Sequence, residues 1–299
     1  MAVIVLSGAD FSANNIGHID LFSGFSSTTK QVFSKFNIVE DERNSMQIAV
    51  DEFIRAIVDN NLWGNGKITA MCLPFLTNLS SSPSVADAMQ NVIADDNFFT
   101  SSDAASSLEL YHNGIRPKIG QLKANIPFES SARGVYTNIH FAIFNIEDEP
   151  DHTINSGTGR VWCSMALAFQ GIQITNNAFN LASSPSNAAG GDANYKKQSA
   201  MRIACYKSDL NDGKGVFYCN GQQSFSNDTN LQGTGLNQIG FGVLAGSYNS
   251  DADSTVQDRA VMQSPTGIMS VGSYLTGEEA LVYTNAANNL VHAIHIYMD

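Results

Sequence analysis

The spacing of apolar residues predicts a strong amphipathic helix in the first third of the chain. Between residues 46 and 58, apolar side chains recur every three or four positions, at Met46, Val50, Phe53, Ile54, Ile57 and Val58. This spacing places them on one face of an α-helix. The polar residues that fall on the opposite face are Asp51, Glu52, Arg55 and Asp59. The apolar face must cover another apolar surface, and we expect that surface to be the β-structure predicted downstream.

Beyond a second helical pattern at residues 85–94, the chain changes to patterns typical of β-strands. Residues 137–148 and 200–208 alternate between apolar and other positions, which predicts strands, and residues 159–174 form a longer apolar run. Polar connections rich in Asn, Ser, Gly and Asp span residues 175–198 and 247–264. Connections of this length are usually functional in compact domains, so we expect a binding surface there.

The last third of the chain combines a hairpin signal with a helix start. Asn220 and Gly221 lie between two strand-like segments, and these residue types tolerate the positive φ angles of a tight hairpin turn. Strand patterns follow at residues 236–246 and 267–277, and a helical pattern covers residues 278–294. Thr276 and Glu279 have the spacing of a capping box, which marks the start of that helix.

Strand, Asn-Gly turn, two further strands and a short helix, in this order, resemble the closing half of a concanavalin A-like (laminin-G-like) jelly roll. The chain looks most like the copies of this module in structural proteins of tailed bacteriophages. Residues 111–129 match the first sandwich strands of that family. The positions that match its preceding helix, turn and strand are Leu62, Trp63, Lys67, Pro74 and Phe75. The resemblance implies a mainly β fold, a concanavalin A-like jelly-roll sandwich with an N-terminal amphipathic helix and a C-terminal helix.

We predict three parts along the chain. Residues 98–299 form the sandwich, residues 38–97 a helical segment packed on it, and residues 1–37 an N-terminal segment for attachment or oligomerisation. The apolar residues of this last segment, Phe25 among them, are too scattered for a core, so we expect a partner to bury them. A chain that begins near Asn37 is expected to stay folded. The resemblance implies other virion proteins as partners, a homotrimer, and location in the virion after synthesis in the host cytoplasm.

Composition narrows the class of partner. The chain has 299 residues, 43% of them hydrophobic, which suffices for one main domain with a sizeable core. A net charge of -12, with no cluster of Lys and Arg, argues against nucleic acid and anionic membranes as partners. No segment approaches the about 20 apolar residues of a membrane helix, so we expect no membrane insertion. Cys72, Cys163, Cys205 and Cys219 lack a CxxC spacing, so no thiol metal site or redox pair is indicated. The apolar strand patterns around Cys163, Cys205 and Cys219 favour buried cysteines there.

Catalysis is the main alternative, because glucanases share the fold that the chain resembles. Retaining glycosidases need two carboxylates about 5 Å apart, and Glu147, Glu149 and Asp151 would share one face of a continuing strand. Pro150 interrupts that strand, and the segment lacks aromatic neighbours. The sequence also has no GxSxG motif and no HxxxH or HExxH pattern for a metal. We therefore expect a protein that is not an enzyme.

The candidate binding residues lie in the long polar connections. Asn249, Asp251 and Asp253 alternate, as oxygen ligands of Ca²⁺ can, although a solvated loop explains the same pattern. Tyr195 adds a ring that can stack on a sugar. The full set is Asp192, Asn194, Tyr195, Tyr248, Asn249, Asp251 and Asp253. No cofactor is expected apart from this Ca²⁺ hypothesis. The predicted function is that of a structural protein of the phage virion, in a fiber, tail appendage or head decoration, with host surface glycans as possible ligands. The alternatives are a glycan-cleaving enzyme of the same fold and a ligand-free capsid cement protein.

Overall fold

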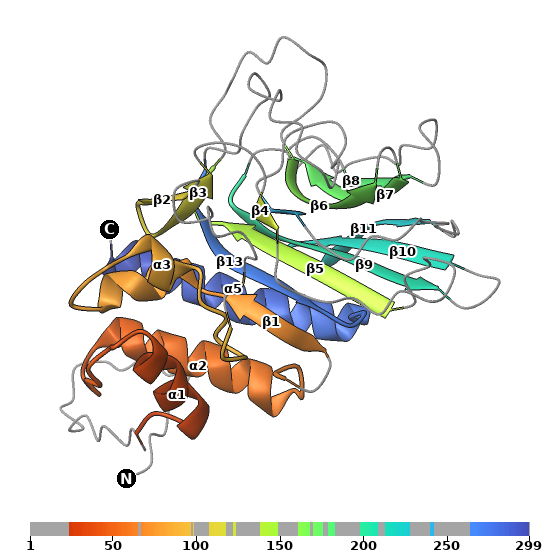
Figure 1. Ribbon diagram of the computed structural model, residues 1–299. Coiled ribbons are helices and arrows are strands. Elements are labelled where there is room, and N and C mark those ends of the chain that lie inside the picture. Colours follow the sequence, from red (N-terminus) through yellow and green to blue (C-terminus); the bar gives the residue numbers. More distant parts are fainter. Residues whose placement is uncertain are drawn as a thin grey trace, which may run out of the picture.

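The computed structural model is mainly β, with two antiparallel sheets and helices on one side of the larger sheet (Figure 1). This arrangement confirms the predicted fold class and is consistent with a jelly-roll sandwich. The structure describes residues 24–64, 67–96, 98, 108–117, 122–123, 138–148, 161–167, 170–175, 179–182, 198–208, 213–227, 240–241 and 264–298.

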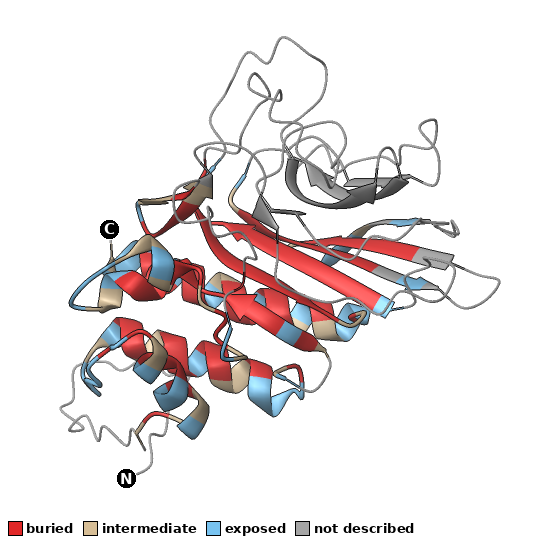
Figure 2. Ribbon diagram, in the orientation of Figure 1, coloured by how far each residue is buried: buried red, intermediate tan, exposed pale blue. Residues whose placement is uncertain are grey.

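Within the described residues, eight strands form the larger sheet, in the order β11-β10-β9-β5-β13-β3-β2, with β1 paired to β13. Every pairing in it is antiparallel. Figure 2 shows that its central strands are buried. Its strands are β1 (Ile68–Cys72), β2 (Leu108–Tyr111), β3 (Gly114–Pro117), β5 (Asn138–Asn145), β9 (Ala200–Ser208), β10 (Gly213–Cys219), β11 (Gln222–Asn227) and β13 (Thr266–Gly272). Strand β1 lies within residues 38–97, the predicted helical segment, so this segment contributes one strand to the sheet. The predicted domain boundaries stay a prediction.

The Asn220-Gly221 turn is confirmed as the connection between β10 and β11. Cys219 pairs with Gln222, so Asn220 and Gly221 alone make the turn. Their φ angles are 48° and 77°, both in the left-handed region that Asn and Gly tolerate.

The smaller sheet has the strand order β4-β12-β6-β7-β8. It contacts the larger sheet where β6 meets β5 and where β7 meets β9. The longer apolar run at residues 159–174 forms two strands, because Leu167 pairs with Gln170 and the chain reverses there. An apolar pattern that continues through a reversal does not mark it. The strands are β4 (Leu122–Lys123), β6 (Val161–Leu167), β7 (Gln170–Thr175), β8 (Phe179–Ala182) and β12 (Gly240–Phe241), the described part of the strand predicted at residues 236–246.

Helix α5 (Gly277–Tyr297) lies against the larger sheet and contacts β9 and β11. Its predicted capping box is confirmed, with both reciprocal hydrogen bonds between Thr276 and Glu279. Helix α2 (Ser45–Asp59) packs on α5, and α1 (Ser27–Lys35) packs on α2, so the helices form layers away from the sheet (Figure 1). The apolar face of α2 therefore contacts mainly α5, where Phe53 lies against Tyr283. The described helices include none that is long and apolar enough to cross a membrane.

Two side chains of α2 lie opposite to their predicted environments. Asp51 is 2% exposed, although its position predicts solvent, and Val58 is 36% exposed, although it belongs to the apolar stripe. The reason is α1, which covers the side of α2 that carries Asp51. Asp51 accepts hydrogen bonds from the Ser26 amide and the Thr29 hydroxyl at the start of α1. A buried carboxylate is stable there because these donors and Arg55 compensate its charge.

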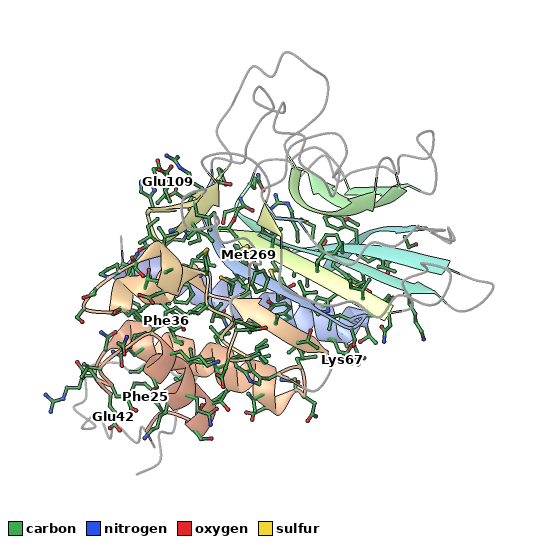
Figure 3. The ribbon with its side chains drawn as sticks, viewed as in Figure 1. Phe25, Phe36, Glu42, Lys67, Glu109 and Met269 are labelled. Carbon is green, nitrogen blue, oxygen red and sulfur yellow. The ribbon has the colours of Figure 1, made fainter. Side chains whose placement is uncertain are left out.

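The N-terminal segment is part of the core from residue 25 onward. Phe25, Val32, Phe33 and Phe36 are each at most 5% exposed and belong to the main hydrophobic cluster. The prediction that a partner buries Phe25 is therefore wrong, whereas the expectation that a chain beginning near Asn37 stays folded stays a prediction, which this burial argues against. Such a chain would lose α1 and expose the surface that α1 covers. Figure 3 labels Phe25 and Phe36 among the packed side chains of this region.

The second predicted helix is also shorter than its pattern. A 3-10 helix, η1 (Pro74–Leu79), is followed by α3 (Val85–Ala88), which ends six residues before position 94. Asn91 is the physical cause, because its side-chain oxygen accepts hydrogen bonds from the Met71 and Ile93 amides and its side-chain nitrogen donates to Asp96. An Asn side chain that bonds to the backbone competes with helical hydrogen bonds.

Candidate functional site

The residues predicted to bind ligand fall outside the described part of the chain. This applies to the whole set, Asp192, Asn194, Tyr195, Tyr248, Asn249, Asp251 and Asp253. Their role and the Ca²⁺ hypothesis stay predictions. Within the described ranges, no three His, Cys, Asp or Glu side chains gather in a way that could hold a metal ion.

The described residues instead bring charged and aromatic side chains together at the turn between β2 and β3. We call this group the β2–β3 corner, and it consists of Glu109, Tyr111, His112, Arg116 and Glu147. Residue pairing across the hairpin sets Glu109 directly opposite Arg116. Because Ile115 of β3 pairs with Thr266 of β13, the corner lies at the end of the larger sheet that is far from Lys67 (Figure 3).

Backbone geometry fixes the turn of the corner. His112 has a φ of 48°, an uncommon value for a residue with a side chain. The side-chain nitrogen of Asn78, near the end of η1, donates to the His112 carbonyl at 3.3 Å and to the Asn113 side-chain oxygen at 3.1 Å. Asn113 is itself buried. A neighbouring element thus holds the turn in the conformation that presents the His112 ring.

Three planar groups form a stack at the corner. The Arg116 guanidinium carbon lies 3.5 Å from the centroid of the Tyr111 ring. The His112 ring lies 4.0 Å from the same centroid, with an angle of 22° between the planes. Two groups so close to one centroid would overlap on the same face, so they occupy opposite faces. Tyr111 is therefore held between Arg116 and His112, and cation–π attraction adds to the stacking.

A carboxylate pairs with the cationic or ionisable group on each side of the stack. Arg116 Nε donates to Glu109 Oε1 at 2.5 Å, and His112 Nδ1 forms a short hydrogen bond with Glu147 Oε1. The side chains of His112 and Glu147 are 52% and 37% exposed, and those of Arg116 and Glu109 are 26% and 33% exposed. The four polar groups are therefore ordered by their partners and still reachable from solvent.

Glu147 was a candidate acid in the glycosidase hypothesis, and the structure places it in a different role. Strand β5 ends at Asn145, before Glu147, so the shared strand face needed for the carboxylate pair does not extend to it. Glu149 and Asp151 lie outside the described residues. The sequence carries one signal for the other corner residues. Glu109 and Tyr111 alternate before the turn, and Arg116 follows four residues after His112, where the turn begins. The contact with Glu147 depends on tertiary structure.

A second polar group lies at the opposite end of the sheet, where α5 begins. Lys67 Nζ pairs with Glu279 at 2.9 Å and donates to the Tyr274 carbonyl at 3.2 Å. His140 is fully buried beside this pair, its Nδ1 hydrogen-bonded to the Ser273 carbonyl and its Nε2 without a hydrogen-bond partner among the described residues. Burial lowers the pKa of His140 to about 4, which the hydrogen bond to Ser273 opposes. The Lys67 and Glu279 side chains are 32% and 26% exposed, and their ion pair ties α5 to the sheet.

Cys205 lies opposite His140 in the neighbouring strand, a pairing that would suit a nucleophile and its base. However, burial raises the pKa of Cys205 to about 12. A nucleophilic cysteine needs a lowered pKa and access to substrate. Cys205 has neither, and it is buried, as is Cys219, which confirms the prediction for these two residues; Cys72 is buried as well, and the Cys163 side chain lies outside the described residues.

A shallow pocket of about 450 Å³ lies between α1, α3 and the loop after α3. Its lining is rich in acidic side chains, and Lys35 already supplies the cation. Lys35 Nζ lies 3.1 Å from Asp95, 3.2 Å from the Asn91 carbonyl oxygen and 2.6 Å from that of Ala94. Lys35 therefore holds the loop after α3 onto α1. Its lining residues are Lys35, Ala86, Asp87, Gln90, Asn91, Ala94, Asp95 and Asp96.

Comparison with known proteins gives no family. No protein-family model matches the sequence, and no curated protein matches it. Similar solved structures include the receptor-binding domain of botulinum neurotoxin type G, with 13% identity and a TM-score of 0.36 over 60% of this chain and 46% of that one. Domain 4 of AbnA, an extracellular arabinanase from Geobacillus stearothermophilus, has 11% identity and a TM-score of 0.38 over 59% of this chain and 80% of that one.

The CBM40 domain of a Ruminococcus gnavus sialidase has 13% identity and a TM-score of 0.36 over 57% of this chain and 96% of that one. This chain spans less than half the length of the botulinum domain that it matches. Similarities at these TM-scores establish neither a shared fold nor a shared activity. We therefore infer function from the two-sheet β fold of this chain and from the β2–β3 corner.

Proposed function

We propose that the protein is a structural component of a tailed-phage virion and that its β-sandwich binds host glycans through the β2–β3 corner. The observation that carries the glycan part is the stack of Arg116, Tyr111 and His112 with a carboxylate on each side. Sugar rings present C–H faces that pack on planar groups, and hydroxyls that donate to carboxylates and accept from N–H groups. The corner offers all three kinds of contact on an exposed turn.

The virion part of the proposal rests on the sequence resemblance to phage structural proteins. Under it, the protein sits in a fiber, tail appendage or head decoration, and it assembles as a homotrimer or on another virion protein. Residues 1–23 make that attachment, because α1 and the residues after it are part of the core. Arg55 Nη2 donates to the Gly24 carbonyl at 2.9 Å and so fixes the point where the attachment segment joins the fold.

The attachment role is tested by comparing the full chain with a chain that begins at Gly24. Circular dichroism checks that both keep the same mainly β spectrum. Light scattering then measures their mass, and sedimentation with phage particles measures their binding. The proposal expects the shortened chain to stay folded and to lose self-association or particle binding. Equal mass and equal particle binding for both chains would rule out residues 1–23 as the attachment segment.

Glycan binding is tested on a microarray of bacterial surface oligosaccharides with the full chain. We expect retention of the wild type and at least a tenfold loss of affinity for His112→Asn, which removes the ring while Asn tolerates the positive φ. Glu40→Gln, in an exposed ion pair on α1's side of the molecule, is the matched control and should bind like the wild type. Release of reducing sugar by the wild type would favour a glycan-cleaving enzyme. Retention of no glycan would favour a ligand-free cement protein.

A further inference from the structure

We infer that the β2–β3 corner selects uncharged glycans and excludes acidic ones. This inference rests on the proposed glycan binding and adds the chemical class of the ligand. Its basis is that each side of the stack already has a carboxylate in contact. Arg116 is engaged by Glu109 at 2.5 Å, and His112 is engaged by Glu147.

An acidic sugar needs a positive charge that is not already balanced, and each cationic or ionisable group of the corner already contacts a carboxylate. A sugar carboxylate that reaches Arg116 or His112 would lie next to Glu109 or Glu147, which already pair with these groups. Like charges at such distances repel. The net charge of the chain, -12, opposes the approach of an anion as well.

A neutral sugar meets no such obstacle. A carboxylate has about four acceptor positions, so Glu109 and Glu147 can each accept from a sugar hydroxyl without leaving their partners. Arg116 uses Nε for Glu109, and a guanidinium has further N–H groups that can donate to a hydroxyl. The outer face of the His112 ring is turned away from Tyr111 and can pack on the C–H face of a sugar. The corner therefore matches a ligand that donates, accepts and stacks without carrying charge.

The Glu109→Gln variant turns this argument into a gain of binding. Glutamine keeps the size of the side chain and removes its charge, which frees the positive charge of Arg116 for an acidic ligand. Glu40→Gln is again the control, because it makes the same change in net charge at the Lys30 ion pair, which is 3.5 Å long and about half exposed. Thermal unfolding verifies that both variants fold like the wild type.

The experiment measures binding of the full chain to a microarray that carries neutral oligosaccharides and their sialylated and uronic-acid counterparts, at physiological salt. We expect the wild type to bind neutral glycans at least tenfold better than acidic ones. Glu109→Gln should raise the ratio of acidic to neutral binding about tenfold, whereas Glu40→Gln should leave it unchanged. His112→Asn should lower neutral binding at least tenfold.

Each other outcome contradicts a specific part of the reasoning. A wild type that prefers acidic glycans, or a Glu109→Gln variant that behaves like Glu40→Gln, overturns the charge argument. If neutral glycans bind and neither Glu109→Gln nor His112→Asn has an effect, glycan adhesion stands but takes place elsewhere, and this inference fails. If the wild type retains no glycan of either class, glycan adhesion itself fails and the inference falls with it.

Discussion

Replacing Asp51 with alanine should destabilise the protein strongly, although the sequence pattern assigns this residue to an exposed helix face. Asp51 Oδ1 accepts from the Ser26 amide at 2.8 Å and from the Thr29 hydroxyl at 2.6 Å. Its Oδ2 accepts from Arg55 Nε at 2.5 Å. Asp51→Ala removes all three interactions and leaves donors at the junction of α1 and α2 without their acceptor.

The size of the loss follows from the surroundings of each donor. A hydrogen bond to a charged group contributes about 1.5–3 kcal/mol. The Thr29 hydroxyl can turn to Ser26 Oγ, 2.8 Å away, so we do not count its bond. Arg55 is 41% exposed and regains water, which reduces its share. The Ser26 amide, the discounted Arg55 pair and the lost packing together give a loss of about 3 kcal/mol.

Urea unfolding at pH 7 measures this loss directly. Glu52→Ala, one position further along on the exposed face of the same helix, should change the free energy of unfolding by less than about 0.5 kcal/mol. Burial raises the pKa of Asp51, but the hydrogen bonds from Thr29, Ser26 and Arg55 outweigh this, so its pKa lies below the ordinary value. The stability it contributes is therefore present above about pH 4 and lost as pH falls further. A loss no larger than that of Glu52→Ala at pH 7 would refute this account of the junction.

Three further variants test other parts of the fold. The pKa of His140 falls from 6.5 in the unfolded chain to about 4 in the folded protein, chiefly by burial. The stability that neutral His140 contributes is therefore fully present above pH 6.5, and the free energy of unfolding drops by about 3 kcal/mol as pH falls to 4. Urea unfolding across this pH range should show that His140→Leu lacks this drop. Lys35→Met removes the contacts with the Asn91 and Ala94 carbonyls, so amide exchange in residues 89–96 should accelerate at least tenfold, and unchanged exchange would mean that Lys35 does not hold the loop. Phe53→Asp buries a charge at a side chain that is 2% exposed, so it should lower the free energy of unfolding by more than about 4 kcal/mol or abolish soluble expression. Val58→Asp, at a side chain that is 36% exposed, should remain folded. Equal behaviour of these two variants would contradict the observed buried face of α2.

Local signals in the sequence predicted the elements whose residues carry their own instructions. Asn220 and Gly221 specify their turn through positive φ, and Thr276 with Glu279 specifies the start of α5, so both were found correctly. Patterns failed where a tertiary contact decides the environment. Asp51 is buried because α1 covers it, and α3 stops early because Asn91 bonds to the backbone of β1 and its own loop. Neither partner can be read from the helical period.

The candidate site depended even more on long-range contacts. Glu109 and Arg116 are cross-strand neighbours that a correct hairpin register would have paired. Glu147 reaches His112 from a point 35 residues away, after β5, and no local pattern links the two. The sequence hypothesis placed binding in residues 192–195 and 248–253, which lie outside the described residues, and that hypothesis stays open alongside the corner.

Amide hydrogen exchange in the presence of a bound glycan tests the central claim most directly. The measurement compares the full chain, free and saturated with the best neutral oligosaccharide from the microarray, and follows the peptide that covers residues 108–117. The β2–β3 corner predicts at least a tenfold slowing of exchange in this peptide and near residues 145–148, with little change at the Lys67 end of the sheet. Saturating glycan that leaves residues 108–117 unchanged while it protects another segment would contradict the assignment of the corner as the binding site.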